Sequence, residues 1–256
     1  MAGIFPSDLF DFAYIHNFEQ RLDTLEALAE DEPWEYQAAA SDHHKPILYN
    51  YLRYTYSRLA EQNKIELSED GQFVVFNTGL ATANQESIFA FFGRNQIPDK
   101  QPWFLLDWHR RGEYELVRFQ RLPDLAHYFD NPSSLVFDVK KDLRANVEHI
   151  IEENRERFPA PYNRMDSYAL QTFLKGAIDN AKQRVARNYK TAIPQFYRGR
   201  VQLLLPLCIT NPSRADLAIV AEDHGDFYRA STCLTLDMAY NNARQLARPD
   251  RDWLKP

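Results

Sequence analysis

Residues 141–200 read KDLRANVEHIIEENRERFPAPYNRMDSYALQTFLKGAIDNAKQRVARNYKTAIPQFYRGR. Apolar residues recur at helical spacing twice in this stretch, which predicts one helix over residues 142–157 and another over residues 168–189. Pro159 and Pro161 separate the two, because the residue before a proline disfavours the helical conformation. We therefore expect two long central helices, around which the rest of the chain is arranged.

Strand patterns flank these helices on both sides. After them come three apolar runs separated by turn residues, then a final helix, at residues 201–210, 216–221, 227–236 and 237–246. Before them the chain predicts a helix from Pro46, a hairpin over residues 65–76 and strands at residues 87–92, 103–108 and 114–119. The expected fold class is α+β, with antiparallel sheet meanders, two long central helices and a C-terminal helix.

The charge of the chain is unevenly distributed. Residues 1–42 hold ten acidic residues and one basic residue, a net charge of −9, whereas residues 43–256 carry +3. Leu22, Leu25 and Leu28 form an apolar stripe within the acidic segment, which indicates an amphipathic helix. We expect an acidic helical arm over residues 1–42 and a single α+β domain over residues 43–256. The overall charge of −6 therefore does not exclude an anionic partner for residues 43–256, which are positively charged.

Other features of the composition exclude several classes of protein. Glycine is scarce, with eight residues, and no glycine-rich phosphate loop is present. Cys208 and Cys233 lie in apolar runs without a Cys/His cluster, so buried free thiols are expected, with no metal site and no cofactor. No apolar run approaches ~18 residues, so we expect no membrane span and a cytoplasmic location.

The strongest functional signal is the run over residues 180–215, which has seven Lys or Arg residues and no acid. Basic residues that alternate with aromatic ones can pair with phosphates and stack on bases. The expected phosphate contacts are Arg184, Arg187, Lys190, Arg198 and Arg200, and the expected stacking residues are Tyr189, Phe196 and Tyr197. Cations late in a helix also complement its dipole, which explains two or three of them without a ligand.

A second set of polar residues suggests a small-nucleotide site. His149 and Glu153 are four residues apart on the first central helix, so they form either a catalytic acid–base pair or an ordinary surface pair. Asn77 and Thr78 suit either a turn or a phosphate contact. The last helix adds two residues, for a hydrogen-bond network or for ligand contact: Asn241 and Arg244.

Several stretches together resemble a known protein family. They are LYNYLRYTYSRLAEQNKI, FNTGLAT, NVEHIIEENRERFP, AKQRVARNYKTAIPQFY, VQLLLPLCI and TLDMAYNNARQLARPDRDWL, and they span about residues 47–254. The chain resembles the "domain of unknown function 3825" family over these residues. The resemblance implies a single α+β domain, carries no established activity, and leaves the acidic arm outside.

Three functions remain open from the sequence. The first is binding of RNA or another single-stranded nucleic acid through the basic, aromatic-interleaved surface. The second is an enzyme or sensor for a small nucleotide, which carries out phosphoester hydrolysis or transfer. The third is a protein-interaction module whose acidic arm docks a partner. A separate hypothesis for the arm is that it lies over the basic run and competes there with a polyanion. The sequence does not determine whether the chain is an enzyme or which oligomer it forms.

Overall fold

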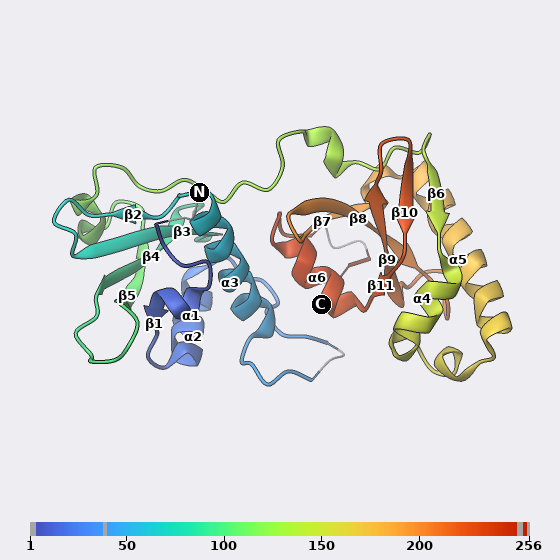
Figure 1. The fold of residues 1–256 in the computed structure, drawn as a ribbon, viewed down its shortest axis with the longest axis horizontal. Coiled ribbons are helices and arrows are strands. Elements are labelled where there is room, and N and C mark those ends of the chain that lie inside the picture. Colours follow the sequence, from blue (N-terminus) through green and yellow to red (C-terminus); the bar gives the residue numbers. More distant parts are fainter. Residues whose placement is uncertain (1–3, 38–39, 250–252, 255–256) are drawn as a thin grey trace. The chain divides into compact units, whose positions relative to one another are not determined.

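The structure is a computed structural model that describes residues 4–37, 40–249 and 253–254. It divides into two compact units, which Figure 1 shows with their helices and strands. The first unit combines Met1–Tyr36 with Ala40–His127, and the second combines Gln37–Ala39 with Tyr128–Pro256. This division differs from the arm and single domain expected from the charge distribution.

The acidic segment is part of the core of the first unit. Leu22 and Leu25 of helix α2 (Phe18–Leu28) are fully buried, and Trp34 is 2% exposed. Burial of a large apolar side chain contributes roughly 1.5–3 kcal/mol, which explains why the segment packs into the unit. The acidic charge of the segment did not indicate this burial, because the acidic residues and the buried leucines occupy different faces of helix α2.

The first unit is a sheet with the strand order β1-β5-β4-β3-β2. β1 and β5 are parallel, and the other neighbours in this order are antiparallel. The elements are α1 (Leu9–Phe12), β1 (Ala13–Tyr14), α2, α3 (Pro46–Glu61), β2 (Glu66–Leu67), β3 (Phe73–Ala81), β4 (Ser87–Arg94), β5 (Trp103–Arg110) and the 3-10 helix η1 (Tyr114–Arg118).

Aromatic side chains fill the space between helix α3 and this sheet. Tyr56 of α3 lies 5.0 Å from Phe12 and 5.5 Å from Phe76 between ring centroids, and Phe12 also meets Phe92 edge-on at 5.2 Å. Such offset and edge-on pairs stabilise a core by more than their buried area alone. The helix and sheet therefore form one packed layer pair in the first unit (Figure 1).

A short 3-10 helix covers the other face of the same sheet. Leu116 and Phe119 are buried against Val75, Phe89 and Phe91. A strand was expected at residues 114–119, and that expectation was wrong. The two buried residues are three positions apart, which matches the period of a 3-10 helix and not the alternation of a strand.

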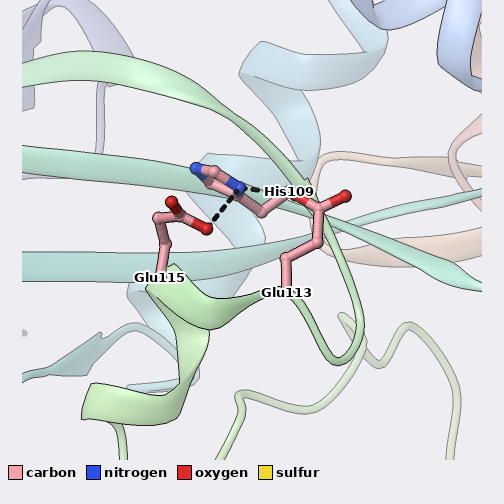
Figure 2. A group of neighbouring side chains, drawn as sticks. All are labelled: His109, Glu113 and Glu115. Atoms are coloured by element: carbon pink, nitrogen blue, oxygen red, sulfur yellow. Dashed lines mark hydrogen bonds and ion pairs between the residues drawn. The ribbon is translucent and has the colours of Figure 1, made fainter.

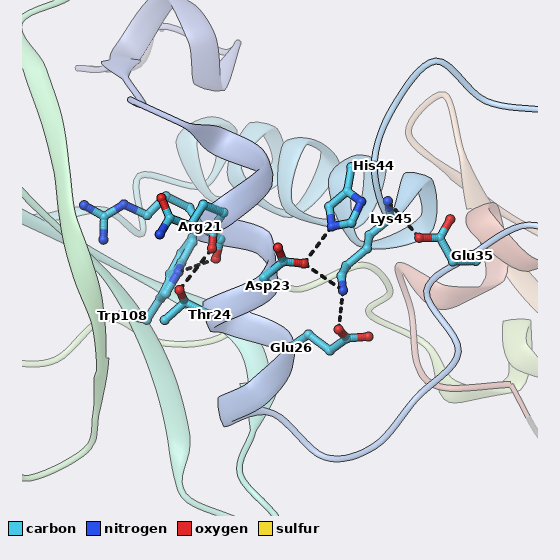
Figure 3. Close-up of polar contacts among 9 residues, drawn as sticks. Arg21, Asp23, Thr24, Glu26, Glu35, His44, Lys45 and Trp108 are labelled. Carbon is cyan, nitrogen blue, oxygen red and sulfur yellow. Dashed lines mark hydrogen bonds and ion pairs between the residues drawn. The ribbon is translucent and has the colours of Figure 1, made fainter.

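Charges on helix α2 are paired within the first unit (Figure 3). Lys45 Nζ lies 2.9 Å from Asp23 Oδ1 and also donates to Glu26, and His44 Nε2 lies 2.6 Å from Asp23 Oδ1. On the opposite side of the helix, Trp108 Nε1 donates to the carbonyl of Arg21 at 2.9 Å. These contacts account for two of the acids that had indicated a separate arm.

The second unit is built on a sheet with the order β6-β10-β9-β8-β7, in which β11 pairs with β9. β6 and β10 are parallel, and the other neighbours are antiparallel. The elements are η2 (Pro132–Leu135), β6 (Asp142–Ala145), α4 (Val147–Asn154), η3 (Arg155–Arg157), η4 (Tyr162–Arg164), α5 (Ser167–Arg187), η5 (Tyr189–Thr191), β7 (Ile193–Tyr197), β8 (Arg200–Leu207), β9 (Leu217–Asp223), β10 (Phe227–Ala230), β11 (Cys233–Leu234) and α6 (Leu236–Arg244).

Helices cover both faces of the second sheet. Helices α4 and α5 lie on one side and α6 on the other (Figure 1). Leu170, Leu174 and Ile178 of α5 pack in the same cluster as Leu203 and Leu205 of β8. This burial on both sides explains why the strands of the terminal meander read as continuous apolar runs.

The α+β class expected from the sequence is confirmed. The second central helix and the last helix lie within two residues of their expected bounds. The first central helix is shorter than expected: residues 142–145 form strand β6 in parallel with β10, and the regular helix ends at Asn154. Pairing with a distant strand satisfies the backbone of residues 142–145, so tertiary structure overrides their local helical pattern.

Candidate nucleic-acid interface

The C-terminal end of helix α5 positions most of the basic residues singled out from the sequence. Asp166 caps the start of the helix by accepting from the Tyr168 amide at 2.9 Å. At the other end the Asn188 amide donates to the Arg184 carbonyl at 2.9 Å, and the Asn188 side chain accepts from the Lys190 amide at 3.1 Å. This turn directs the chain into the 3-10 helix η5 and fixes where the residues after α5 lie.

A basic patch surrounds this end of α5. We call Arg184, Arg187, Tyr189, Lys190 and Arg214 the helix-end patch. Tyr189 is 64% exposed, and Arg187, Lys190 and Arg214 are exposed on either side of it in the sequence. Arg184 is half-buried and donates to the carbonyl of Pro212, which holds the turn that carries Arg214 against the helix. The patch therefore combines several cations with one open aromatic ring.

Carboxylates near the helix-end patch are occupied by other contacts. Asp216 Oδ2 accepts from the amides of Ile209 and Thr210 at 2.7 and 2.8 Å, and its Oδ1 accepts from the Thr210 hydroxyl at 2.6 Å. On α5, Asp179 lies 3.9 Å from Lys182. Among the residues that the structure describes, no carboxylate forms an ion pair with Arg187 or Arg214, and both side chains are exposed.

The remaining basic residues form a second group at the tip of the β7–β8 hairpin. Arg198 and Gly199 both have positive φ, +48° and +79°, as a tight two-residue turn requires. Tyr197 is 43% exposed, with the Arg198 guanidinium 5.2 Å from its ring centroid. Arg200 Nη1 lies 3.2 Å from Glu222 Oε1, so its charge is partly neutralised. Strand β7 separates this tip from the helix-end patch by roughly 13 Å, at about 3.3 Å per residue.

Phe196 is not available for base stacking. Its exposure is 8%, and it packs edge-on against Tyr128 with ring centroids 4.9 Å apart. β7 is covered on both faces, because Gln195, which points the other way, is only 1% exposed. The expectation of a stacking role for Phe196 is corrected on this ground, while Tyr189 and Tyr197 keep exposed rings.

Asn77 and Thr78, expected as nucleotide contacts, make internal hydrogen bonds on strand β3 of the first unit. The Asn77 side chain donates to the Pro123 carbonyl at 3.4 Å and accepts from the Gly79 amide at 3.0 Å. The Thr78 hydroxyl donates to the Ile88 carbonyl at 2.6 Å and accepts from the Leu80 amide at 3.2 Å. Both residues are buried, so their polar atoms serve the strand and not a ligand.

The other residues of the expected nucleotide pocket lie on different helices of the second unit. His149 and Glu153 are both exposed on α4, and the described residues show no hydrogen bond or ion pair between them. Asn241 and Arg244 lie on α6, where Arg244 is 8% exposed. A pocket that collects all six residues is not present within either unit.

Residues at the C-terminal end of α4 and in η3 hold the fold of the second unit together. Asn154, which is 2% exposed, accepts from the Thr232 hydroxyl at 3.1 Å, and Arg157 donates to the Cys233 carbonyl at 2.6 Å. Arg157 lies eight residues after His149, beyond the end of the regular helix α4. Its contacts connect the end of α4 to the strand β11 region.

The division into units separates the charges of the chain. The first unit contains 20 acidic and 11 Lys or Arg residues, a net charge of −9, and the second contains 16 and 19, a net charge of +3. The acid-free run lies entirely in the second unit. The positive unit is therefore the one that suits a polyanion.

Comparison with known proteins places this α+β chain in a family. The family model described as "Domain of unknown function (DUF3825)" matches residues 25–253, so the chain belongs to this family. The match begins within helix α2, earlier than the resemblance expected from about residue 47. No curated protein and no solved structure matches the chain. Among the described residues, no helix is long and apolar enough to cross a membrane.

Proposed function

We propose that the second unit binds single-stranded nucleic acid through the helix-end patch, with the hairpin tip as a further contact. The observation that carries this proposal is the exposed Tyr189 ring placed between the cations Arg187 and Lys190 in the sequence. Arginine and lysine supply donors for phosphate oxygens, and a tyrosine ring supplies a surface on which a base stacks.

The arrangement favours a single strand over a duplex. Tyr189 offers its ring to solvent, and stacking on it requires a base whose face is free. A base that stacks on an aromatic side chain contributes roughly 1–3 kcal/mol irrespective of its identity. The interface should therefore tolerate many sequences and depend strongly on salt concentration, because phosphate contacts release counterions.

The test is fluorescence anisotropy with the full chain at low salt. The probes are a labelled single-stranded RNA of about 16 nucleotides, the DNA of the same sequence and the corresponding duplex. We expect both single strands to bind more tightly than the duplex. Comparison of the RNA with the DNA shows which of the two nucleic acids the protein prefers. Absence of binding to both single strands at low salt overturns the proposal.

Variants locate the binding surface. Arg187→Gln combined with Lys190→Gln should weaken binding at least about tenfold and lower the salt slope by about 0.7 for each phosphate contact that is lost. Tyr189→Ala should weaken binding by roughly 1–3 kcal/mol with little change in slope. Lys175→Gln is the matched control, because Lys175 is exposed on the same helix two turns before the patch. Equal binding by the double variant and the control contradicts the proposed surface.

A further inference from the structure

A group of side chains that could hold a metal ion lies in the first unit, whereas the helix-end patch belongs to the second. The sequence HRRGEYE places His109 at the end of strand β5 and Glu113 and Glu115 on either side of the start of η1. Gly112, with φ +93°, makes the turn between them. The chain reverses there, so both glutamates return toward the histidine. The expected strand over residues 114–119 would have carried Glu115 away from it.

The three ligand atoms converge on one point. His109 Nδ1 lies 2.7 Å from Glu113 Oε2 and 3.5 Å from Glu115 Oε2, and the ligand atoms of all three residues lie within 4.8 Å of one another. Figure 2 shows the carboxylates of Glu113 and Glu115 both joined to the same ring nitrogen of His109. The turn at Gly112 thus brings three donor atoms from β5 and the start of η1 close together.

The surroundings hold these side chains in place. The His109 side chain is 12% exposed, and its ring packs edge-on against Phe91 at 5.2 Å. Arg110 Nε donates to the second oxygen of Glu113 at 2.7 Å and so orients the carboxylate whose other oxygen faces His109. Outer contacts of this kind are what fix the ligands of metal sites in proteins.

The donor geometry of the group suits a cation. A neutral imidazole carries one N–H, so Nδ1 can donate to only one of the two carboxylates that face it. A divalent cation placed among the three side chains would instead bind all three donors at once.

We propose that His109, Glu113 and Glu115 bind one divalent transition-metal ion of the Zn²⁺ class. An imidazole nitrogen with two carboxylate oxygens is a donor set that suits Zn²⁺ and Mn²⁺, whereas Mg²⁺ prefers oxygen ligands alone. Metal–ligand distances of about 2.0–2.2 Å require only small side-chain movements from the positions seen here. Three protein ligands leave a coordination position for water or another small ligand.

The test is isothermal titration of the full-length protein, untagged and treated with chelator, with Zn²⁺, Mn²⁺ and Mg²⁺ separately. We expect one saturable Zn²⁺ site per chain and weaker binding of Mg²⁺. Zn²⁺ should also raise the melting temperature, because a ligand that binds only the folded state stabilises it. Absence of a saturable site, or tighter binding of Mg²⁺ than of Zn²⁺, overturns the proposal.

Variants show whether this group is the site. His109→Gln and Glu115→Gln should each lower Zn²⁺ affinity at least about tenfold, since each removes a ligand. Glu115 is the more exposed of the two, so Glu115→Gln tests the site even if the histidine variant misfolds. The matched control is His224→Gln, because His224 lies 3.6 Å from Glu222 in a simple His–Glu pair. Unchanged affinity in a folded Glu115→Gln protein contradicts the assignment.

Discussion

Asn242 Nδ2 donates a hydrogen bond to Gln195 Oε1 at 3.1 Å and so connects helix α6 to strand β7. Gln195 in turn donates from Nε2 to Gln202 Oε1 on β8 at 2.8 Å. Gln195 is 1% exposed, so water does not reach its amide, and Asn242 and Gln202 are the hydrogen-bond partners of this group. Asparagine is a poor residue for the interior of a helix, and Asn242 has a structural partner that explains its presence on α6.

Replacement of Gln195 should destabilise the second unit. Gln195→Leu keeps the volume but removes the partner of Asn242 and of Gln202, and an unpaired buried polar group costs roughly 1–3 kcal/mol. Urea denaturation followed by circular dichroism measures the change. Gln183→Leu, at an exposed position on α5, serves as the control and should alter stability by less than about 0.5 kcal/mol. Equal stability of the two variants would show that the amide chain contributes nothing.

Gly79 and Gly71 give a matched pair in the first unit. Both have positive φ, +75° and +66°, so alanine strains the backbone at either position. A Cβ at Gly79 would also overlap the hydroxyl of Tyr51, whereas a Cβ at Gly71 meets open space. Gly79→Ala should therefore cost at least about 2 kcal/mol and Gly71→Ala about 1 kcal/mol. Unfolding monitored by tryptophan fluorescence, to which Trp34, Trp103 and Trp108 contribute in the first unit, measures both variants, and a smaller loss for Gly79→Ala contradicts the packing seen here.

The ion pair between Asp8 and Arg53 should make the first unit sensitive to acid. Partial burial raises the pKa of Asp8, but its hydrogen bonds with Arg53 Nη2, at 2.9 Å, and the Phe10 amide outweigh this and hold the pKa below its usual value. A carboxyl whose pKa is lowered by folding stabilises the protein above its unfolded pKa of about 3.9, and that stability is lost as the pH falls through the folded pKa.

Urea denaturation between about pH 5 and pH 2 tests this contribution. The wild type should lose up to about 1 kcal/mol more than Arg53→Gln over this range, since Asp8 is partly exposed to solvent. Arg121→Gln is the control, because Arg121 pairs with Asp124 where both side chains are largely exposed. If Arg53→Gln keeps the full pH dependence of the wild type, the pair is not its source.

The two cysteines should differ in reactivity. Burial raises the pKa of the Cys233 thiol to about 12, and it also raises the pKa of Cys208, which is only half-buried. At pH 8 the thiolate fraction of Cys233 is on the order of 10⁻⁴, so a thiol reagent should modify it only after local or global unfolding. The Cys208→Ser variant, which keeps only Cys233, should therefore be labelled much more slowly than the Cys233→Ser variant, which keeps only Cys208. Rapid labelling of Cys233 in folded protein contradicts its burial.

Local patterns predict the parts of this fold that local contacts build. The helical spacing of Leu170, Leu174 and Ile178 marks helix α5, and these residues are buried as the spacing requires. Strand β6 escaped prediction because its hydrogen-bonding partner, β10, lies far along the chain. Phe196 illustrates the same limit within the candidate interface, since only the tertiary structure shows that Tyr128 covers it.

The His109 group escaped prediction for a related reason. The spacing of His109, Glu113 and Glu115 is visible in the sequence, but a strand over residues 114–119 would have pointed the glutamates elsewhere. The buried pair Leu116 and Phe119, three residues apart, was the available signal for a 3-10 turn. The cluster of His109, Glu113 and Glu115 can therefore be recognised only once the turn at Gly112 is known.

The parallel pairing of β6 with β10 also affects how the protein is made. Leu143 pairs with Tyr228, which leaves the ribosome 85 positions later. At 5–20 residues per second this interval lasts roughly 4–17 s, during which α4 and α5 have no complete sheet to cover their apolar sides. The apolar sides of these helices therefore stay exposed until late in synthesis, and expression in cells should respond to translation speed more than the final stability of the unit suggests.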